Sequence, residues 1–341
     1  DVYQDDEQEF ENRDMIQAHG YDREFVARGD GMGIYGADDN NNIKFFGDIP
    51  LINEYEGNPA ENMMLYENEN KLLFIDPKER NQIKCFDFEK EKVVEEWSST
   101  GNKDFTSLFS ETKNAQNTTS NNIVATTQKG MFSLDPRINK GNKTAIQKVY
   151  STNYLFNKIS TNLNGNIAVG SMNGEIRMYT KLGQNAKTML PGLGENISHL
   201  DVSKDGVWIL ATTDKYILLI PTKTKGGMTG FEKRMGKEKP IPRKLKLVNS
   251  DIVKHGLNAS KFTKASFNNG GNITESFITA SIGSYIVIWK LKKVAKGNLG
   301  DYDIKKLHNS VVASEGKWDT ENEIIVALPK SLTLENRRRK K

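Results

Sequence analysis

Short apolar runs recur along this chain in a fixed arrangement. Each copy is an apolar run that ends in small residues, a turn of two to four residues, and a second apolar or alternating run. Seven copies occur, among them REFVARGDGMGIYG, GNIAVGSMNGEIRMYT, SFITASIGSYIVIWK and NEIIVALPKSLTLEN. Runs of this length with turn residues between them predict β-hairpins. Long helical patterns with caps are absent.

The spacing of the copies indicates the architecture. Successive copies, aligned on Ala27, Ile75, Ala125, Val169, Ala211, Ala280 and Ala327, are separated by 48, 50, 44, 42, 69 and 47 residues. Apart from the spacing of 69, these spacings are close to the length of a four-stranded propeller blade, which is roughly 40 to 50 residues. Two β-sandwiches would not give such even spacing. We therefore predict an all-β, seven-bladed, WD-repeat-like β-propeller with four-stranded antiparallel blades.

The inner strands of a propeller are covered on both faces, which agrees with apolar runs such as VWILA and YIVIW. We assign the propeller to residues 15–335, with 1–14 as an acidic linker or a ring-closing segment and 336–341 as a basic tail. SLTLENRRRKK leaves little sequence after Leu334 for an outer strand. We therefore expect Val2 and Tyr3, or a nearby segment, to complete the seventh blade, because a propeller must hide its edge.

The stretch GDGMGIYG has the Gly-x-Gly-x-x-Gly spacing of a dinucleotide-binding loop and of a kinase phosphate loop. That spacing binds phosphate only when a helix opens after it or an ATP site lies beneath it. Here ADDNNNIKFF follows, which reads as a turn and a strand, and no kinase motif follows. We interpret Gly29 to Gly36 as the turn between two inner strands.

Composition agrees with a globular protein, at 36% hydrophobic and 27% charged residues. No apolar run approaches the roughly 20 residues of a membrane span, and no signal peptide opens the chain, so we expect a cytoplasmic or nuclear location. Cys85 is the only cysteine, which excludes an intramolecular disulfide and a multi-cysteine zinc site. Because the first residue is Asp1, the sequence reads as a piece of a longer protein.

The formal net charge of the chain is +4, but the charged residues are unevenly distributed along it. Residues 1–14 hold seven acids against one arginine, and residues 223–246 hold nine bases against Glu232 and Glu238. The basic stretch is an insertion that accounts for the long repeat spacing. Pro240 and Pro242 favour an extended segment to which a partner docks, and its charge suits acidic peptides, phosphate or lipid headgroups. The alternative is a solvated loop whose PRKLKLV end supplies the outer strand of the fifth blade.

Eight cations are our candidates for partner binding. Three come from the fourth copy, whose loops we expect near the insertion, and five come from the insertion. They are Arg177, Lys181, Lys187, Lys233, Arg234, Lys237, Lys239 and Arg243.

Candidate catalytic chemistry is sparse. None of the four histidines has a metal-ligand spacing. His199 and Asp201 face the same side of a strand, and we favour a structural pair over a catalytic one. We therefore expect no catalytic residue, no cofactor and no metal. The alternative is an enzyme whose site residues come from several blades and converge on the central channel.

Nucleic acid is a further alternative that we do not favour. Single strands are bound by aromatic side chains interleaved with positive charge, and the insertion offers only Phe231. The closing RRRKK, Arg337 to Lys341, reads as a disordered tail, with an electrostatic arm or a nuclear address as the alternative.

Several long motifs resemble one family. The runs GEIRMYTKLGQNAKTMLPGLG, ISHLDVSKDGVWILATTDKYILLIPT, TGFEKRMGKEKPIPRKLKL and YIVIWKLKKVAKG resemble the C-terminal domain of the vacuolar import and degradation protein 27 family. The resemblance covers residues 15–335 and departs in the Asn-rich loops around 38–42 and 114–122. It implies a WD-repeat propeller, a missing N-terminal region and a link to vacuolar import and degradation, with no enzymatic activity.

The WD signature itself is degenerate. Trp289 closes an inner strand, but Lys290 stands where WD repeats carry Asp, and Tyr179 and Leu134 hold the equivalent position in other copies. We therefore expect apolar contacts to hold the blades together. The sequence predicts a non-catalytic platform for protein partners, as a monomeric domain, with a phosphoinositide- or RNA-binding propeller as the alternative.

Overall fold

The computed structural model describes residues 2–4, 10–20, 22–29, 31–38, 42–50, 61–115, 122–138, 141–237 and 239–337. For residues 2–4 and 61 it describes the backbone alone. Most of the two Asn-rich loops, Glu238 and residues 338–341 lie outside the described residues. The described strands form seven four-stranded antiparallel sheets, so the chain is the seven-bladed β-propeller that the repeat predicts.

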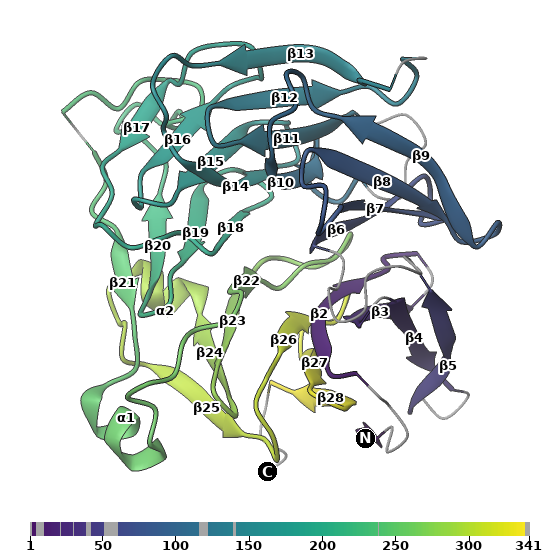
Figure 1. Cartoon of the computed structure of the whole chain (residues 1–341). Coiled ribbons are helices and arrows are strands. Elements are labelled where there is room, and N and C mark those ends of the chain that lie inside the picture. Colours follow the sequence, from purple (N-terminus) through teal and green to yellow (C-terminus); the bar gives the residue numbers. More distant parts are fainter. Residues whose placement is uncertain are drawn as a thin grey trace. The chain divides into compact units, whose positions relative to one another are not determined.

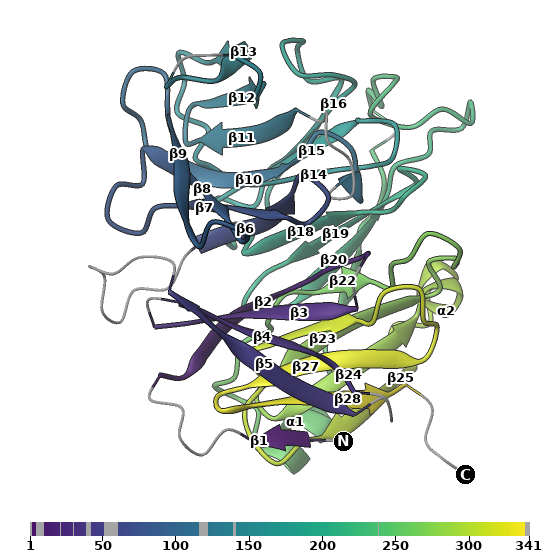
Figure 2. The ribbon, with the colours of Figure 1, turned by 90° about the vertical axis from the view of Figure 1, so that its right-hand side faces the viewer.

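Contacts between Cα atoms divide the chain into two compact units. The first comprises Asp1–Pro59, Thr212–Leu219 and Arg243–Lys341, and the second comprises Ala60–Ala211 and Ile220–Pro242. Figure 1 labels the strands, and Figure 2 shows them from the side.

The first unit contains three complete blades. The first blade is β2 (Asn12–Gln17), β3 (Arg23–Arg28), β4 (Gly31–Ala37) and β5 (Ile43–Pro50). The sixth is β22 (Ser266–Phe267), β23 (Phe277–Ile282), β24 (Tyr285–Lys290) and β25 (Tyr302–Lys306). The seventh is β26 (Ala313–Gly316), β27 (Glu323–Leu328), β28 (Ser331–Asn336) and β1 (Val2–Gln4).

The second unit contains three more. The second blade is β6 (Glu61–Tyr66), β7 (Lys71–Ile75), β8 (Gln82–Asp87) and β9 (Lys92–Ser98). The third is β10 (Phe105–Ser110), β11 (Ile123–Thr127), β12 (Gly130–Leu134) and β13 (Thr144–Val149). The fourth is β14 (Phe156–Thr161), β15 (Ile167–Ser171), β16 (Ile176–Tyr179) and β17 (Thr188–Leu190).

The fifth blade is β18 (His199–Val202), β19 (Trp208–Thr212), β20 (Ile217–Pro221) and β21 (Arg243–Leu245). Its outer strand β21 pairs with β20, Leu245 opposite Ile217, as the PRKLKLV motif predicts. Two short helices, α1 (Asn249–His255) and α2 (Leu291–Ala295), follow β21 and β24. In every blade the two strands of the repeated hairpin are the second and third in the sheet.

The last sheet is completed by the first strand of the chain. β1 runs antiparallel to β28, with Val2 opposite Thr333 and Gln4 opposite Ser331. β28 continues to Asn336, and the Arg337 side chain is buried, so residues 336 and 337 belong to the fold rather than to the expected tail. The Arg337 guanidinium donates to the carbonyl of Glu321 and lies over the ring of Phe277. Burial lowers its pKa to about 10.

Neighbouring blades within each unit share apolar cores. In the second unit Leu73 and Cys85 of the second blade pack with Phe105 and Phe132 of the third. In the first unit Val26 packs with Ile325 and Leu332 of the seventh blade. This packing explains why the inner strands are apolar throughout, since both of their faces are buried. It also agrees with the expectation that apolar contacts hold the blades together.

The GDGMGIYG stretch is a hairpin, but its glycines have two different roles. Gly29 lies in the turn with φ +55°, a conformation that favours glycine. Gly31, Gly33 and Gly36 are not turn residues, because they lie in strand β4. A Cβ at Gly31 would lie 2.6 Å from the carbonyl oxygen of Ile49 in the paired strand. The spacing therefore reflects close packing of the sheet.

Candidate functional site

The basic insertion is anchored by two apolar residues. Phe231 and Met235 are buried, although the cations around them are exposed. The carbonyl of Phe231 accepts a hydrogen bond from Thr180 Oγ1 at 2.6 Å, and the Met235 N–H donates to Thr188 Oγ1 at 3.4 Å. The insertion is therefore held against the fourth blade.

A tight turn precedes these anchors. The Thr229 N–H and hydroxyl both donate to Glu232 Oε2 at 2.9 Å. These two hydrogen bonds lower the pKa of the Glu232 carboxyl. Glu232 thus acts within the loop's own turn, and its hydrogen bonds stabilise the start of the basic segment.

Four of the predicted cations converge on one groove. A concavity of about 320 Å³ is lined by Lys187 from the segment before β17 and by Arg234, Lys237 and Lys239 from the insertion. The remaining lining residues are Thr188, Met189, Met235 and Gly236. We call this the basic groove.

The described residues of the basic groove carry positive charge only. In the described part of the chain, none of its four cationic side chains forms an ion pair or a side-chain hydrogen bond, and no acid lines it. All four residues are exposed. Like charges held close together repel, so an anion bound between them relieves that repulsion. The groove can therefore bind carboxylates or phosphates.

The other four predicted residues do not line the groove. Lys181 and Lys233 are exposed elsewhere in the second unit. Arg177 is mostly buried, with its guanidinium 3.8 Å from the centre of the Tyr154 ring and 3.3 Å from Glu175 Oε2. Arg243 lies in β21 and donates to the carbonyl of Ala295 at 2.7 Å. Both arginines have structural partners.

Sequence reasoning missed the uncharged part of the groove. Thr188, Met189 and Met235 were not candidates, because they carry no charge and lie in different segments. One signal for Met235 is its position four residues after Phe231 in an otherwise polar stretch. Phe231 is fully buried, so the insertion's only aromatic ring is not available for stacking on a base.

A model of the VID27 C-terminal WD40-like domain matches residues 10–341. The chain belongs to the Vid27 family. Vacuolar import and degradation protein 27 of Schizosaccharomyces pombe is 32% identical over 333 residues, and that of Saccharomyces cerevisiae is 33% identical over 339. The alignments cover 94% and 95% of this chain, but 41% and 43% of the relatives. The chain is thus a propeller related to vacuolar import and degradation proteins and spans about two fifths of their length.

Solved structures support the fold of this Vid27 domain. The β-propeller domain of Cps50 (Swd1) from Myceliophteria thermophila matches 96% of this chain and 97% of its own, with a TM-score of 0.63. Sequence identity is 10%, so the likeness concerns the fold alone.

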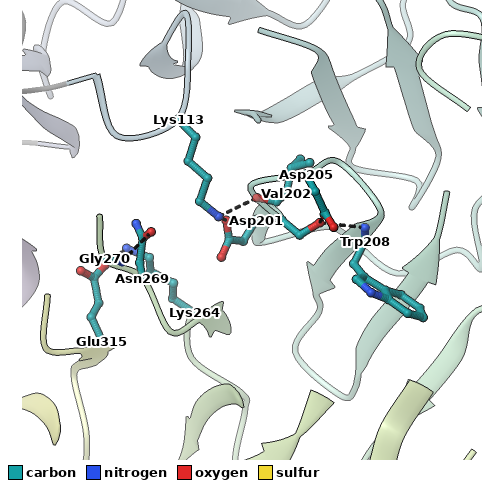
Figure 3. Close-up of polar contacts among 10 residues, drawn as sticks. Lys113, Asp201, Val202, Asp205, Trp208, Lys264, Asn269, Gly270 and Glu315 are labelled. Carbon is teal, nitrogen blue, oxygen red and sulfur yellow. Dashed lines mark hydrogen bonds and ion pairs between the residues drawn. The ribbon is translucent and has the colours of Figure 1, made fainter. Parts of the chain in front are cut away.

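In this Vid27 domain Asp201 has a structural partner from another blade. Lys113 Nζ donates to Asp201 Oδ1 at 2.7 Å and also to the carbonyl of Val202 (Figure 3). Both side chains are largely buried. Removing either one would leave a buried charge uncompensated, so the pair is a fixed structural contact. His199, the other member of the predicted pair, is half-buried at the start of β18.

Nearby, Asp205 organises the turn into β19. Its carboxylate accepts hydrogen bonds from Ser203 Oγ and the Val207 N–H. Ser203 Oγ accepts one from the Trp208 N–H, and Figure 3 labels Asp205 and Trp208. Gly206 has φ +72°. Residues 205 and 206 therefore form a tight Asp-Gly turn.

Among the described residues, no group of three or more His, Cys, Asp or Glu side chains is arranged to hold a metal ion. None of the described helices is long and apolar enough to span a membrane.

Proposed function

We propose that this domain is a non-catalytic interaction platform whose basic groove binds acidic segments of partner proteins in a vacuolar import and degradation pathway. The observation that carries the proposal is the convergence of Lys187, Arg234, Lys237 and Lys239 without a described counter-charge. The pathway comes from the family relationship.

The physical basis is electrostatic complementarity. The backbone that carries the cations of the insertion loses little conformational freedom when an anion binds, because the buried Phe231 and Met235 anchor the loop. Exposed charges at an interface raise the association rate and select against partners of the same sign. The groove therefore favours acidic segments over neutral or basic ones.

The test compares two double variants with equal change in charge. Arg234→Glu/Lys237→Glu reverses two groove cations, and Lys181→Glu/Lys233→Glu reverses two exposed cations outside the groove. Arg243 is unsuitable for such a test, because its bond to Ala295 joins β21 to α2.

The readouts are binding of a labelled hexaglutamate peptide and recovery of partners from a cell extract at low and physiological salt. We expect the groove variant to weaken peptide binding by about tenfold or more, and the control to retain it within roughly threefold. Equal losses of peptide affinity in the two variants would mean that net charge alone attracts the peptide. Unchanged affinity in both would refute the proposal that the basic groove binds acidic segments.

Anionic membranes are the second candidate ligand, and one observation favours them. Ile241 is 85% exposed between Pro240 and Pro242, two residues after the groove residue Lys239. Basic residues beside an exposed apolar side chain are typical of proteins that dock on anionic lipid surfaces.

Sedimentation with phosphatidylcholine vesicles, with and without phosphatidylinositol phosphates, tests this candidate. Membrane docking predicts that binding requires the anionic lipid and that Ile241→Ser, which changes no charge, reduces it by several-fold, while the same variant leaves hexaglutamate binding unchanged. Equal sedimentation with both kinds of vesicle would exclude this candidate.

A further inference from the structure

A second groove lies in the first unit, beside α1, and none of its residues belongs to the candidates from sequence. Its volume is about 400 Å³, within the range of ligand pockets. Its apolar floor is formed by the buried side chains Leu247, Leu257, Phe262 and Ile282. We call it the α1 groove.

The helix beside this groove adds no residue to the core. None of the seven residues of α1 is buried, and Val253, which lines the groove, is 72% exposed. An isolated helix this short is unstable in water, so contacts with its surroundings must hold it. The helix thus presents an apolar side chain to solvent at the edge of an apolar floor.

Contacts from the sixth blade fix α1 in place. The hydroxyl of Tyr302 donates to Asp251 Oδ2 at 2.7 Å and accepts from the Val248 N–H at 2.9 Å. At the other end of the helix the His255 ring lies 4.6 Å from the ring of Tyr285. These contacts leave the groove open and its wall preformed, which lowers the entropic cost of binding.

The charge of the rim selects the ligand. Lys215 and Lys246 line the groove, and none of the described acidic residues does. Asp214, next to Lys215 in sequence, pairs with Lys261 at 2.6 Å, and Asp251, next to the lining residue Ile252, accepts from Tyr302. An apolar floor with a basic rim fits a segment that combines a large apolar side chain with carboxylates.

We propose that the α1 groove binds a short acidic segment of a partner protein that inserts one large aliphatic or aromatic side chain against Leu257 and Phe262. Carboxylates on either side of that side chain would pair with Lys246 and lie close to Lys215, which adds positive charge to the rim. This is recognition of a peptide by a preformed pocket, with an apolar anchor and a polar rim. It does not depend on the basic groove.

The experiment uses Arg234→Glu/Lys237→Glu as the starting protein, so that acidic peptides cannot be held by the basic groove. A random peptide library displayed on phage is selected on this protein. The most enriched sequence is then synthesised with a fluorescent label, and its binding is measured by anisotropy.

We expect enriched peptides with a large apolar residue between acidic ones. Val253→Asp and Lys246→Glu should each weaken binding of the labelled peptide by about tenfold. The matched controls are Lys254→Glu, which changes an exposed α1 residue outside the groove, and Val149→Asp, at an exposed valine of β13. Both should bind like the starting protein.

Two results would overturn the proposal. One is a selection that enriches no acidic and apolar sequence. The other is a peptide whose binding is equally strong in the groove variants and the controls. Because the starting protein already lacks an intact basic groove, neither result bears on the function proposed for that groove.

Discussion

At the scale of single residues, Glu24 is a carboxyl group that the fold holds in its neutral form. Its side chain is buried in β3, and burial, with Asp22 adding to the effect, raises its pKa to about 8. Lys317 and a hydrogen bond with Gln17 act in the opposite direction but are weaker. At neutral pH the folded chain therefore keeps a proton that the unfolded chain loses.

This residue predicts a pH dependence of stability. Between the ordinary pKa of 4.5 and the folded value of about 8, the folded state binds more protons than the unfolded state. The free energy of unfolding should therefore fall as pH rises through this window. Glu24→Gln should flatten the dependence and stabilise the domain at pH 8 by on the order of 3 kcal/mol.

Urea unfolding of both proteins at pH 5, 6.5 and 8 measures the difference. Asp22→Asn is a useful control, because it removes the smaller contribution and keeps the carboxyl of Glu24. Parallel curves for wild type and Glu24→Gln would show that this carboxyl does not titrate in the window.

The cations illustrate which features of a site sequence can reveal. Charge and spacing are visible in the sequence, so the convergence of Lys187 with the insertion could be anticipated from the neighbouring repeats. The contacts of Arg177 and Arg243 could not be anticipated in this way. Arg177 stacks on Tyr154, which lies in a loop 23 residues earlier, and Arg243 donates to a carbonyl of α2. Such contacts depend on tertiary packing, which residue type does not specify.

At the scale of elements, β1 is a three-residue strand with a large role in its sheet. Without it the edge of β28 would expose unpaired backbone groups, which favours association between chains. Deleting residues 1–9 removes β1 but leaves β2, which begins at Asn12, intact. The melting temperature should then drop by roughly 2–8 °C, and aggregation should increase.

A length-preserving control separates pairing from charge in this prediction. Replacing Asp5, Asp6, Glu7 and Glu9 by their amides removes acidity but retains β1. Differential scanning calorimetry should give a wild-type melting temperature for this variant. If the amide variant melts as early as the deletion, charge rather than strand pairing accounts for the loss.

Elements also differed in how well the sequence predicted them. The hairpins were predicted well, because strands covered on both faces must be apolar, and turn residues mark their ends. The helices were not. α1 has no buried residue and therefore no apolar periodicity to recognise, and α2 is only five residues long. The α1 groove escaped prediction as well. Most of its lining residues belong to the segment 246–262 that contains α1, and Lys215 and Ile282 complete the lining from distant parts of the sequence.

At the scale of the whole molecule, the domain joins residues from opposite ends of its sequence. Val2 pairs with Thr333, and the side-chain amide of Asn12 donates to the carbonyl of Leu328. During synthesis, the ribosome releases the N-terminal segment long before its partners exist. The last sheet must therefore wait until β27 and β28 have been synthesised, and a chain cut short before them by a premature stop codon would retain an unpaired strand by which quality control could recognise it.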